Sequence, residues 1–273
     1  MLKVALADVT KMLARMEIQG IGSAVREEQL QALRKNLLRE QAAIFKRMGK
    51  IIEARRLEAA ERAIVLGSAV DTALLEAAGR TDEAKALRDV ALRASEETLA
   101  LAETRVTSSR IPLAERIYRN EVWMNGRLED KINSALLRGL PAREFAAEAR
   151  DWFSPSTPGG IRYAAMRLAR TEINNAYHAT SIHNAHEKPW INQMKWHLSR
   201  SHPKPDLCDR FAKGGRDGDG VYDVRDVPRK PHPHCFCFVT PIPPEEDAFL
   251  DALVAGRYDG YLRSKGLGSA GPS

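Results

Sequence analysis

The apolar positions in the first part of the chain recur at helical spacing. Residues 2–17 are predicted to form a short amphipathic helix that ends before Gly20. Ser23 then caps a long helical segment that contains no proline and extends toward Ala78. Apolar side chains of this segment, spaced by three, four or seven residues, form a seam typical of coiled coils: Leu30, Leu33, Leu37, Ile44, Met48 and Ile51. One helix cannot bury such a seam alone, so the pattern predicts a helical partner.

A helical partner follows directly in the sequence. Gly79-Arg80-Thr81 is a signal for one helix to stop and another to begin, and residues 82–106 again have a helical pattern. The two segments predict an antiparallel hairpin of long helices within residues 1–110. Nothing in this region has catalytic spacing, and its charged, alanine-rich surface is typical of a spacer or a docking arm.

Beyond a boundary predicted at residues 108–112, helical patterns continue. The predicted elements are, in order, a helix over 112–138, a helix that begins at Pro141, a loop over 154–160 and a helix over 161–186.

The predicted helix over 161–186 has a carboxylate on its apolar face. Glu172 lies among small and apolar side chains at helical spacing: Ala165, Leu168, Ala169, Ile173 and Ala176. Arg170 is two positions from Glu172, so the two side chains point in different directions and do not pair within the helix. We therefore expect a buried Glu172 to accept bonds from a tertiary Arg, Lys or backbone amide. A polar link that stabilises the fold explains this position, and a catalytic carboxylate is the alternative.

Alternating patterns follow this helix and predict short strands. Residues 191–198 place Met194, Trp196 and Leu198 on one face and Gln193, Lys195 and His197 on the other, which is typical of a half-buried strand. Residues 202–209 are predicted to form a loop, residues 221–224 and 236–241 two further strands, and residues 244–255 a last helix. The expected fold class is mainly α with a small β-containing C-terminal domain (α+β) and a long helical N-terminal hairpin.

Composition and charge narrow the classes of protein that fit. The chain has 273 residues, of which 29% are charged and 6% aromatic, and its formal net charge of +6 is mild for a nucleic-acid-binding protein. The densest excess of basic residues lies in Lys195–Arg216, so contact with a polyanion would be local. The sequence has no secretion signal and no run of the roughly 20 apolar residues that a membrane helix needs. Three cysteines, an odd number, favour a reducing cytosol with free or metal-bound thiols.

All three cysteines and all seven histidines lie within residues 178–237. A tetrahedral zinc site would explain this clustering, with these ligands: Cys208, His232, Cys235 and Cys237. His202 or His234 are alternates for the histidine. On a regular strand Cys235 and Cys237 would point to the same face two residues apart, so a shared ion requires the chain to turn there. Buried thiols without a metal are the alternative.

The same region contains the side chains of a hydrolytic centre. An acid–base or metal-nuclease centre would use His202, Asp206, Asp209 and His234, although no spacing specifies their arrangement.

An ordered set of motifs within residues 112–243 resembles a known family. The set is Arg167-x-x-Arg170-Thr171-Glu172 with Asn175, Met194-Lys195-Trp196, Asp206-x-Cys208-Asp209, Pro231-His232-Pro233-His234-Cys235-Phe236-Cys237 and Pro241. Gly139-Leu140-Pro141-Ala142-Arg143-Glu144-Phe145-Ala146 also looks like the helix that precedes the Arg-Thr-Glu helix in that family. Together these residues resemble the C-terminal domain of the phage Mu F-like head morphogenesis proteins.

This resemblance implies a domain organisation. Residues 111–243 would be the head morphogenesis domain, between the helical arm of residues 1–110 and a C-terminal helix with a flexible tail at residues 244–273. The structural core of the motif would be Arg167, Arg170, Thr171, Glu172, Asn175, Lys195 and Trp196. The chain differs from the family at two places: Phe211 stands where a second cysteine often follows the first, and Phe236 where a basic residue is common between the last two cysteines.

The resemblance also implies a function and partners. It implies a non-enzymatic minor capsid protein of a tailed bacteriophage or prophage, made in the bacterial cytoplasm and present in several copies in the virion head. Its expected partners in procapsid assembly and DNA packaging are the portal protein and the major capsid or scaffold protein, with no membrane. Packaged double-stranded DNA is a further expected partner, contacted by basic residues: Lys195, Arg200, Lys204, Arg210, Lys213 and Arg216. A solvated basic face is the alternative to DNA contact.

Two other functions stay open at the level of sequence. One is a metal-dependent nuclease or transferase that uses Glu172 and the His/Cys cluster. The other is a cytosolic interaction module stabilised by zinc, without a role in a virion.

Overall fold

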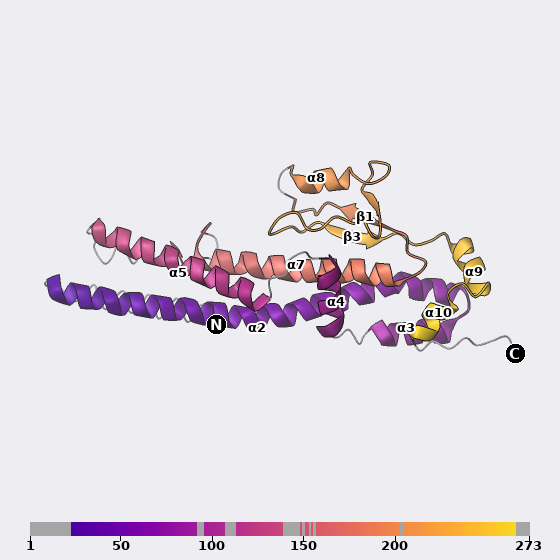
Figure 1. Cartoon of the computed structure of the whole chain (residues 1–273), viewed down its shortest axis with the longest axis horizontal. Coiled ribbons are helices and arrows are strands. Elements are labelled where there is room, and N and C mark those ends of the chain that lie inside the picture. The colour runs from indigo at the N-terminus through magenta and orange to yellow at the C-terminus, as the bar shows by residue number, and fades with distance from the viewer. Residues whose placement is uncertain are drawn as a thin grey trace. The chain divides into compact units, whose positions relative to one another are not determined.

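The computed structural model of the chain describes residues 23–91, 96–106, 113–138, 148, 151–152, 154, 157–202 and 205–265. Within these ranges the chain forms eight helices and one three-stranded antiparallel sheet (Figure 1). This confirms the mainly α fold with a small β-containing C-terminal part. The predicted helix over residues 2–17, the boundary at 108–112 and most of the helix that begins at Pro141 lie outside the described residues.

The longest element is α2, Ser23–Ala77, an unbroken helix of 55 residues. Its buried residues recur every 11 positions along two lines: Leu37, Met48 and Ala59, and Gln41, Ile52 and Ala63. A repeat of 11 residues corresponds to about 3.67 residues per turn, close to a straight helix, whereas the predicted seam assumed a coiled-coil repeat. The predicted seam is therefore wrong at Ile51, which is 58% exposed, while Ile52 is fully buried.

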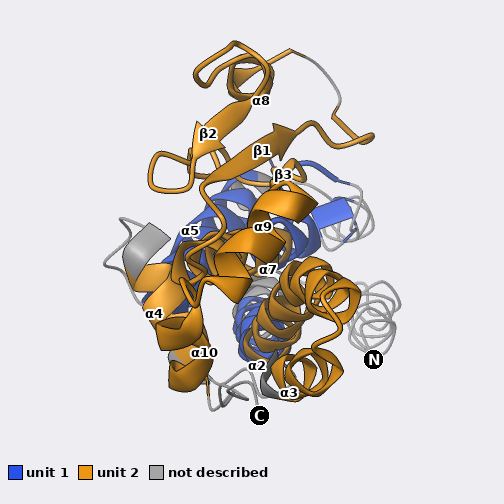
Figure 2. Cartoon of the chain, turned by 90° about the vertical axis from the view of Figure 1, so that its right-hand side faces the viewer, with its two compact units in different colours: residues 1–52, 111–169 blue, residues 53–110, 170–273 orange. Residues whose placement is uncertain are grey.

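The chain packs as two compact units, coloured separately in Figure 2. Unit 1 contains residues 1–52 and 111–169, and unit 2 contains residues 53–110 and 170–273. Helices α2 and α7 (Ile161–Glu187) contribute residues to both units. The packing therefore does not follow the predicted division at residue 110, and the arm as a functional part stays a prediction.

Unit 1 has an apolar core made by three helices. Helix α5 (Leu113–Leu137) contributes Met124, Leu128 and Ile132 to the same cluster as the buried residues of α2 and the first turns of α7. A polar pair lies inside this unit, because Gln41 is fully buried and its Nε2 donates to Asn125 Oδ1. The apolar side chains of the helices thus explain why the long α2 is stable over its first half.

In unit 2 the chain runs back along α2 through two short helices, α3 (Thr81–Ala91) and α4 (Glu96–Val106). Leu75 and Ala84 belong to one apolar cluster, Ala60 and Leu99 to another, and Arg56 forms an ion pair with Glu103. The prediction of a single helix over residues 82–106 is therefore wrong. Leu99 of α4 packs into a separate cluster, whereas Ala102 of α4 shares the cluster of Ala84, and these tertiary contacts override a continuous helical pattern.

The sheet has the strand order β2-β1-β3, with β1 (Gln193–His197) paired antiparallel to β2 (Val221–Asp223) and β3 (Phe238–Pro241). Met194 and Trp196 are buried while Lys195 and His197 are half-buried, so the predicted alternation is confirmed within β1. It is wrong at Leu198, which lies beyond the strand and is exposed. In Figure 1 the sheet lies between α7 and a short helix, α8 (Leu207–Ala212). The third strand begins at Phe238, two residues later than predicted.

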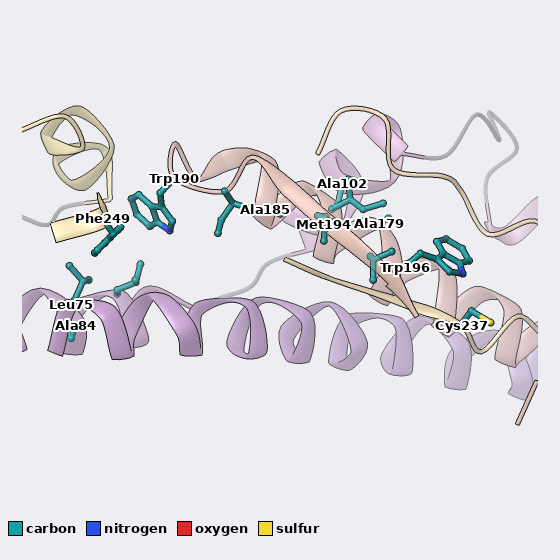
Figure 3. Close-up of a cluster of buried hydrophobic side chains, with 14 of the residues drawn as sticks. Leu75, Ala84, Ala102, Ala179, Ala185, Trp190, Met194, Trp196, Cys237 and Phe249 are labelled. Carbon is teal, nitrogen blue, oxygen red and sulfur yellow. The ribbon is translucent and has the colours of Figure 1, made fainter. Parts of the chain in front are cut away.

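A cluster of aromatic side chains closes the C-terminal end of unit 2. Trp190 packs edge-on against three rings from the segment that contains α9 (Glu246–Val254) and α10 (Asp259–Ser264): Phe249, Tyr258 and Tyr261. Figure 3 shows Trp190 beside Phe249 at one end of this apolar cluster and Trp196 near Cys237 at the other. The core of unit 2 therefore extends from the aromatic rings to the cysteines.

A buried ion pair lies beside these rings. The ammonium group of Lys188 donates to a carboxylate oxygen of Asp71 and to the Gly67 carbonyl oxygen, the latter at 2.6 Å. The other carboxylate oxygen of Asp71 accepts a bond from Trp190 Nε1 at 2.7 Å. The side chains of Lys188 and Asp71 are 2% and 1% exposed, so each buried charge is stabilised by the opposite charge and by these hydrogen bonds. No pattern in the sequence indicates this pair.

Among the described residues, no helix combines the length and the apolar character needed to cross a membrane.

Candidate metal centre

Helix α8 positions the first cysteine. The Cys208 N–H donates to Asp206 Oδ1 at 2.6 Å, and the Asp206 N–H donates to Asp209 Oδ2 at 2.7 Å. This reciprocal arrangement is a capping box, which satisfies the free amides at the start of a helix. Cys208 is held fully buried as a result. The predicted loop over residues 202–209 is wrong in its last three positions, and the Asp-x-x-Asp spacing was the signal for the helix.

The segment from His232 to Cys237 brings the other two cysteines to the same place. His234 has a left-handed backbone, with φ of 64°, and its N–H donates to Thr171 Oγ1 of α7 at 3.2 Å. Cys235 and Cys237 precede β3 and are both buried. Cys235 and Cys237 therefore do not lie on a regular strand. A shared ion requires this, because on a regular strand the two thiols would be too far apart.

Five Cys and His side chains form two overlapping sets of metal donors, and His202 forms a third set with the two carboxylates Asp206 and Asp209. One set is Cys208, His232 and Cys235, the other is His202, Cys208 and Cys237, and the donor atoms within each set lie within 4.8 Å of one another. Cys208 Sγ is 3.4 Å from Cys235 Sγ and 3.5 Å from His232 Nε2. Cys237 Sγ is 4.0 Å from His202 Nδ1. The structure thus brings together the cysteines and two histidines of the predicted cluster, with Cys208 common to both sets.

These separations fit a tetrahedral zinc ion. With Zn–S and Zn–N distances of about 2.3 and 2.0 Å, ligand atoms at the corners of a tetrahedron lie about 3.5–3.8 Å apart. The contacts of Cys208 with Cys235 and His232 lie close to that range. Thiolate and imidazole donors are also the set that zinc prefers. The donor types and the spacing of Cys208, Cys235 and His232 therefore fit zinc, while Cys237 lies in the second set with His202.

Both histidines are oriented by oxygen atoms. His202 Nε2 is 2.8 Å from Asp209 Oδ2, which leaves Nδ1 toward Cys237. His232 Nδ1 is 2.8 Å from the Pro233 carbonyl oxygen, which leaves Nε2 toward Cys208, although Asp206 Oδ2 also lies 3.0 Å from that nitrogen. Hydrogen bonds of this kind fix the tautomer and orientation of histidines that bind metals. Asp209 thus orients His202 and Asp206 caps α8, whereas the sequence predicted both carboxylates as parts of a hydrolytic centre.

The third histidine considered as a ligand, His234, lies outside both donor sets. Its ring packs edge-on against Phe236, with the ring centres 6.4 Å apart. The left-handed backbone at His234 turns the chain between Pro233 and Cys235, so this residue acts through its backbone contact with α7. The proposal of His234 as an alternate metal ligand is not supported by this geometry.

Without a metal, Cys208 and Cys235 hold their protons more strongly than free thiols do, because their pKa values are raised. Burial raises the pKa of Cys208, and the neighbouring Cys235 and Cys237 raise it further. Burial also raises the pKa of Cys235, although Lys230 opposes this change. Because zinc binds thiolates, its binding must release these protons, and its affinity will fall as the pH falls.

Lys230 supplies positive charge next to the thiols. Its Nζ donates to the carbonyl oxygens of Cys235, at 3.3 Å, and of Cys237. Burial lowers the pKa of Lys230, while Cys235, Cys237 and Cys208 act in the opposite direction. A zinc ion with three thiolates and one histidine has one net negative charge, so this ammonium group would offset it and hold the turn between the two cysteines.

Replacing Lys230 by methionine is therefore expected to weaken zinc binding by about 10–100-fold, the range for loss of an outer-shell partner. Competition with a chromophoric chelator measures this affinity. The Arg229→Met variant removes a neighbouring exposed charge and serves as the control. Equal affinities for the two variants would contradict the role of Lys230.

Comparison with known proteins finds no matching family model, curated protein or solved structure.

The residues expected to form the core of the Arg-Thr-Glu motif differ in burial. Glu172 is 4% exposed and Trp196 2% exposed, as expected for packed positions. The half-buried members are Thr171, Asn175 and Lys195, and the exposed members are Arg167 and Arg170. The two arginines therefore do not belong to the packed interior, because they lie on the opposite side of α7 from its small residues.

A buried histidine links α7 to the loop before the cysteines. His178 Nε2 donates to the Pro228 carbonyl oxygen at 2.9 Å, and the imidazole packs edge-on against Trp196. Burial lowers the pKa of His178 to about 3, with Lys230 contributing in the same direction and the bond to Pro228 opposing it. His178 and Thr171 together fasten the segment of residues 228–234 to α7.

The depressed pKa of His178 predicts acid sensitivity. In the unfolded chain His178 has a pKa near 6.5 and is protonated below that pH. In the folded chain it stays neutral down to about pH 3. The contribution of His178 to the free energy of unfolding is therefore fully present above pH 6.5. Below that pH the free energy falls by about 1.4 kcal/mol per pH unit, which amounts to about 2 kcal/mol at pH 5. Urea unfolding at pH 5 and 7.5 tests this, because His178→Gln should lose the slope while His186→Gln on the same helix keeps it. Identical slopes in the two variants would exclude His178 as the cause.

The basic residues expected to contact DNA differ in exposure among the described positions. Arg200, Arg210, Lys213 and Arg216 are exposed, whereas Lys195 is half-buried on β1. Arg216 Nη2 lies 3.2 Å from Asp223 Oδ2, which offsets part of its charge. Lys204 lies outside the described residues.

Proposed function

We propose that this protein is a structural, non-enzymatic head morphogenesis protein of a tailed bacteriophage or prophage, in which one zinc ion closes the C-terminal fold. The observation that carries the proposal is the donor set around Cys208. Three buried thiols and two histidines lie in two sets of three donors that share Cys208, and the two sets together supply the four ligands of a closed tetrahedral site. A catalytic zinc instead keeps a position free for water or substrate. Cys208, Cys235, Cys237 and His232 are the proposed ligands, with His202 as the alternate.

The environment of Glu172 also favours a structural role. A metal nuclease or transferase that uses this carboxylate needs it to reach substrate, yet its side chain is almost completely buried on α7. The contacts of Thr171 and His178 with residues 228–234 tie the Arg-Thr-Glu helix to the cysteine segment. This supports a single inert unit formed by the helix and the metal cluster.

The role in the virion rests on the ordered motifs that resemble the phage Mu F-like proteins. In this proposal the protein docks on the portal or the inner capsid during procapsid assembly and DNA packaging. The test is retention of the purified chain by the portal ring encoded in the same genome, with an unrelated phage portal as the control. Failure to bind the cognate ring would contradict the docking role.

An enzymatic assay distinguishes the rival function. The proposal predicts no metal-dependent cleavage of DNA or RNA by the zinc-loaded protein. Cleavage that disappears in a folded Glu172→Gln variant would favour the nuclease. Loss of folding in that variant, without any cleavage by the wild type, would support the structural role.

DNA contact is a separate part of the proposal. The exposed basic residues would meet phosphates, so binding to duplex DNA should be independent of sequence and should weaken steeply with salt. Fluorescence anisotropy at several salt concentrations measures this. Arg210→Ala combined with Lys213→Ala should reduce the salt dependence, and binding that is equally weak at low and high salt would exclude DNA as a partner.

A further inference from the structure

The second half of α2 has an inverted pattern of polar and apolar residues. Between Arg62 and Glu76 every exposed residue is apolar: Val65, Leu66, Ala69, Val70 and Ala73. The buried residues of the same stretch include polar ones: Ser68, Asp71 and Thr72. Leu66 is 60% exposed, Val65 40% and Val70 37%. A helix on the surface of a protein normally points its apolar side chains inward.

The contacts within unit 2 explain the buried polar residues but not the exposed apolar ones. Asp71 holds Lys188 and Trp190, and Thr72 Oγ1 donates to the Ser68 carbonyl oxygen at 2.8 Å. These bonds require the polar face of α2 to turn inward. These bonds do not account for the exposed apolar residues. A contiguous exposed apolar patch is typical of an interaction surface.

A hollow lies along this patch because its central residues are small. It has a volume of about 210 Å³ and is lined by residues of α2 and α3: Val65, Ser68, Ala69, Thr72, Ala73, Glu76 and Arg88. Small residues along a helix allow another helix to approach closely. The surface therefore has the shape of a helix-binding site.

We propose that the apolar patch of α2, Val65–Ala73, binds the same patch of a second copy of this chain in antiparallel orientation. The argument rests on charge and size. A two-fold axis between Ala69 and Val70 places Leu66 of one copy opposite Ala73 of the other, so large and small side chains alternate across the contact. The same axis brings Arg62 of each copy beside Glu76 of the second copy, whose carboxylate also pairs with Arg88 of its own chain at 2.9 Å. A parallel arrangement would instead place like charges together.

The contact is small, which limits its strength. A stable interface buries about 800 Å² on each partner, more than five side chains of one helix provide. The chain is therefore expected to be a monomer when dilute and to dimerise at about 10–100 µM, or where several copies are held close together. This inference goes beyond the proposed function and does not depend on the metal.

Sedimentation equilibrium on the full chain, from about 1 to about 500 µM, tests the proposal. The wild type should change from monomer to dimer over this range, and Leu66→Glu should raise the dissociation constant at least about tenfold. Because Leu66 is exposed, this variant should keep the circular dichroism spectrum and melting temperature of the wild type. Leu101→Glu, which changes an exposed leucine of α4, is the matched control and should dimerise normally.

A charge exchange tests the orientation. Arg62→Glu and Glu76→Arg should each weaken the dimer, because each places like charges opposite one another. The double variant should restore it, because Glu at position 62 of one copy then lies beside Arg at position 76 of the other. A chain that remains monomeric throughout the range overturns the proposal. A dimer that is insensitive to Leu66→Glu, or single charge variants without effect, would overturn this surface or its antiparallel orientation.

Discussion

Replacing Asp71 by alanine is expected to lower the free energy of unfolding by about 3–5 kcal/mol. The substitution leaves the ammonium group of Lys188 buried without its counter-charge and leaves Trp190 Nε1 without its acceptor. Burial already lowers the pKa of Lys188, and Asp71 opposes that change. Removal of one partner of a buried ion pair is costly because the other charge stays away from water. Urea unfolding monitored by tryptophan fluorescence measures the loss.

Two further variants separate the buried charge from the loss of packing. Asp223→Ala breaks the exposed ion pair with Arg216 and should change stability by no more than about 1 kcal/mol. The double variant Asp71→Leu with Lys188→Met removes both charges and should recover much of the loss. If Asp71→Ala and Asp223→Ala have equal effects, the buried pair does not stabilise unit 2 as described.

Loss of the metal is expected to have a comparable effect on unit 2. Cys208 belongs to both donor sets, so Cys208→Ser should weaken zinc binding by more than the roughly 100-fold attributed to outer-shell partners. At a free zinc concentration of about 1,000 times the dissociation constant, bound metal adds about 4 kcal/mol to stability, and this variant should lose that contribution. Chelation of the wild type should have the same effect, measured as unfolding with and without added zinc.

The histidines provide the control for this prediction. His234→Asn keeps a residue that tolerates the left-handed backbone and lies outside both donor sets, so zinc binding should be retained. His232→Asn should weaken binding more than His202→Asn, because His232 Nε2 lies closer to its sulfur than His202 Nδ1 does. Equal retention of zinc by Cys208→Ser and His234→Asn would contradict the ligand assignment.

Local patterns predicted most of the elements of this fold. The absence of proline and the restart at Gly79 predicted the long α2, and alternation around Lys195 predicted the half-buried β1. The predicted coiled-coil seam failed at Ile51 because a straight helix of about 3.6 residues per turn drifts away from a seven-residue repeat. The single helix predicted over residues 82–106 failed because the tertiary contacts of its two halves, at Ala84 and at Leu99, override a continuous helical pattern.

The metal cluster shows what sequence patterns can and cannot supply. Residue type and grouping in the sequence predicted the metal donors Cys208, Cys235 and Cys237, together with His202 and His232. Residue type alone did not indicate that Lys230 faces the cysteine carbonyls, or that Asp206 and Asp209 form a helix cap. The pair of Asp71 and Lys188 is separated by 117 positions, and only the folded chain brings it together.

Zinc content measured by native mass spectrometry tests the central claim most directly. The account predicts one zinc ion for each folded wild-type chain, resistant to mild chelation, and none in the Cys208→Ser variant. A folded wild-type chain that carries no metal after expression with zinc would contradict the account, and so would a Cys208→Ser variant that retains its ion.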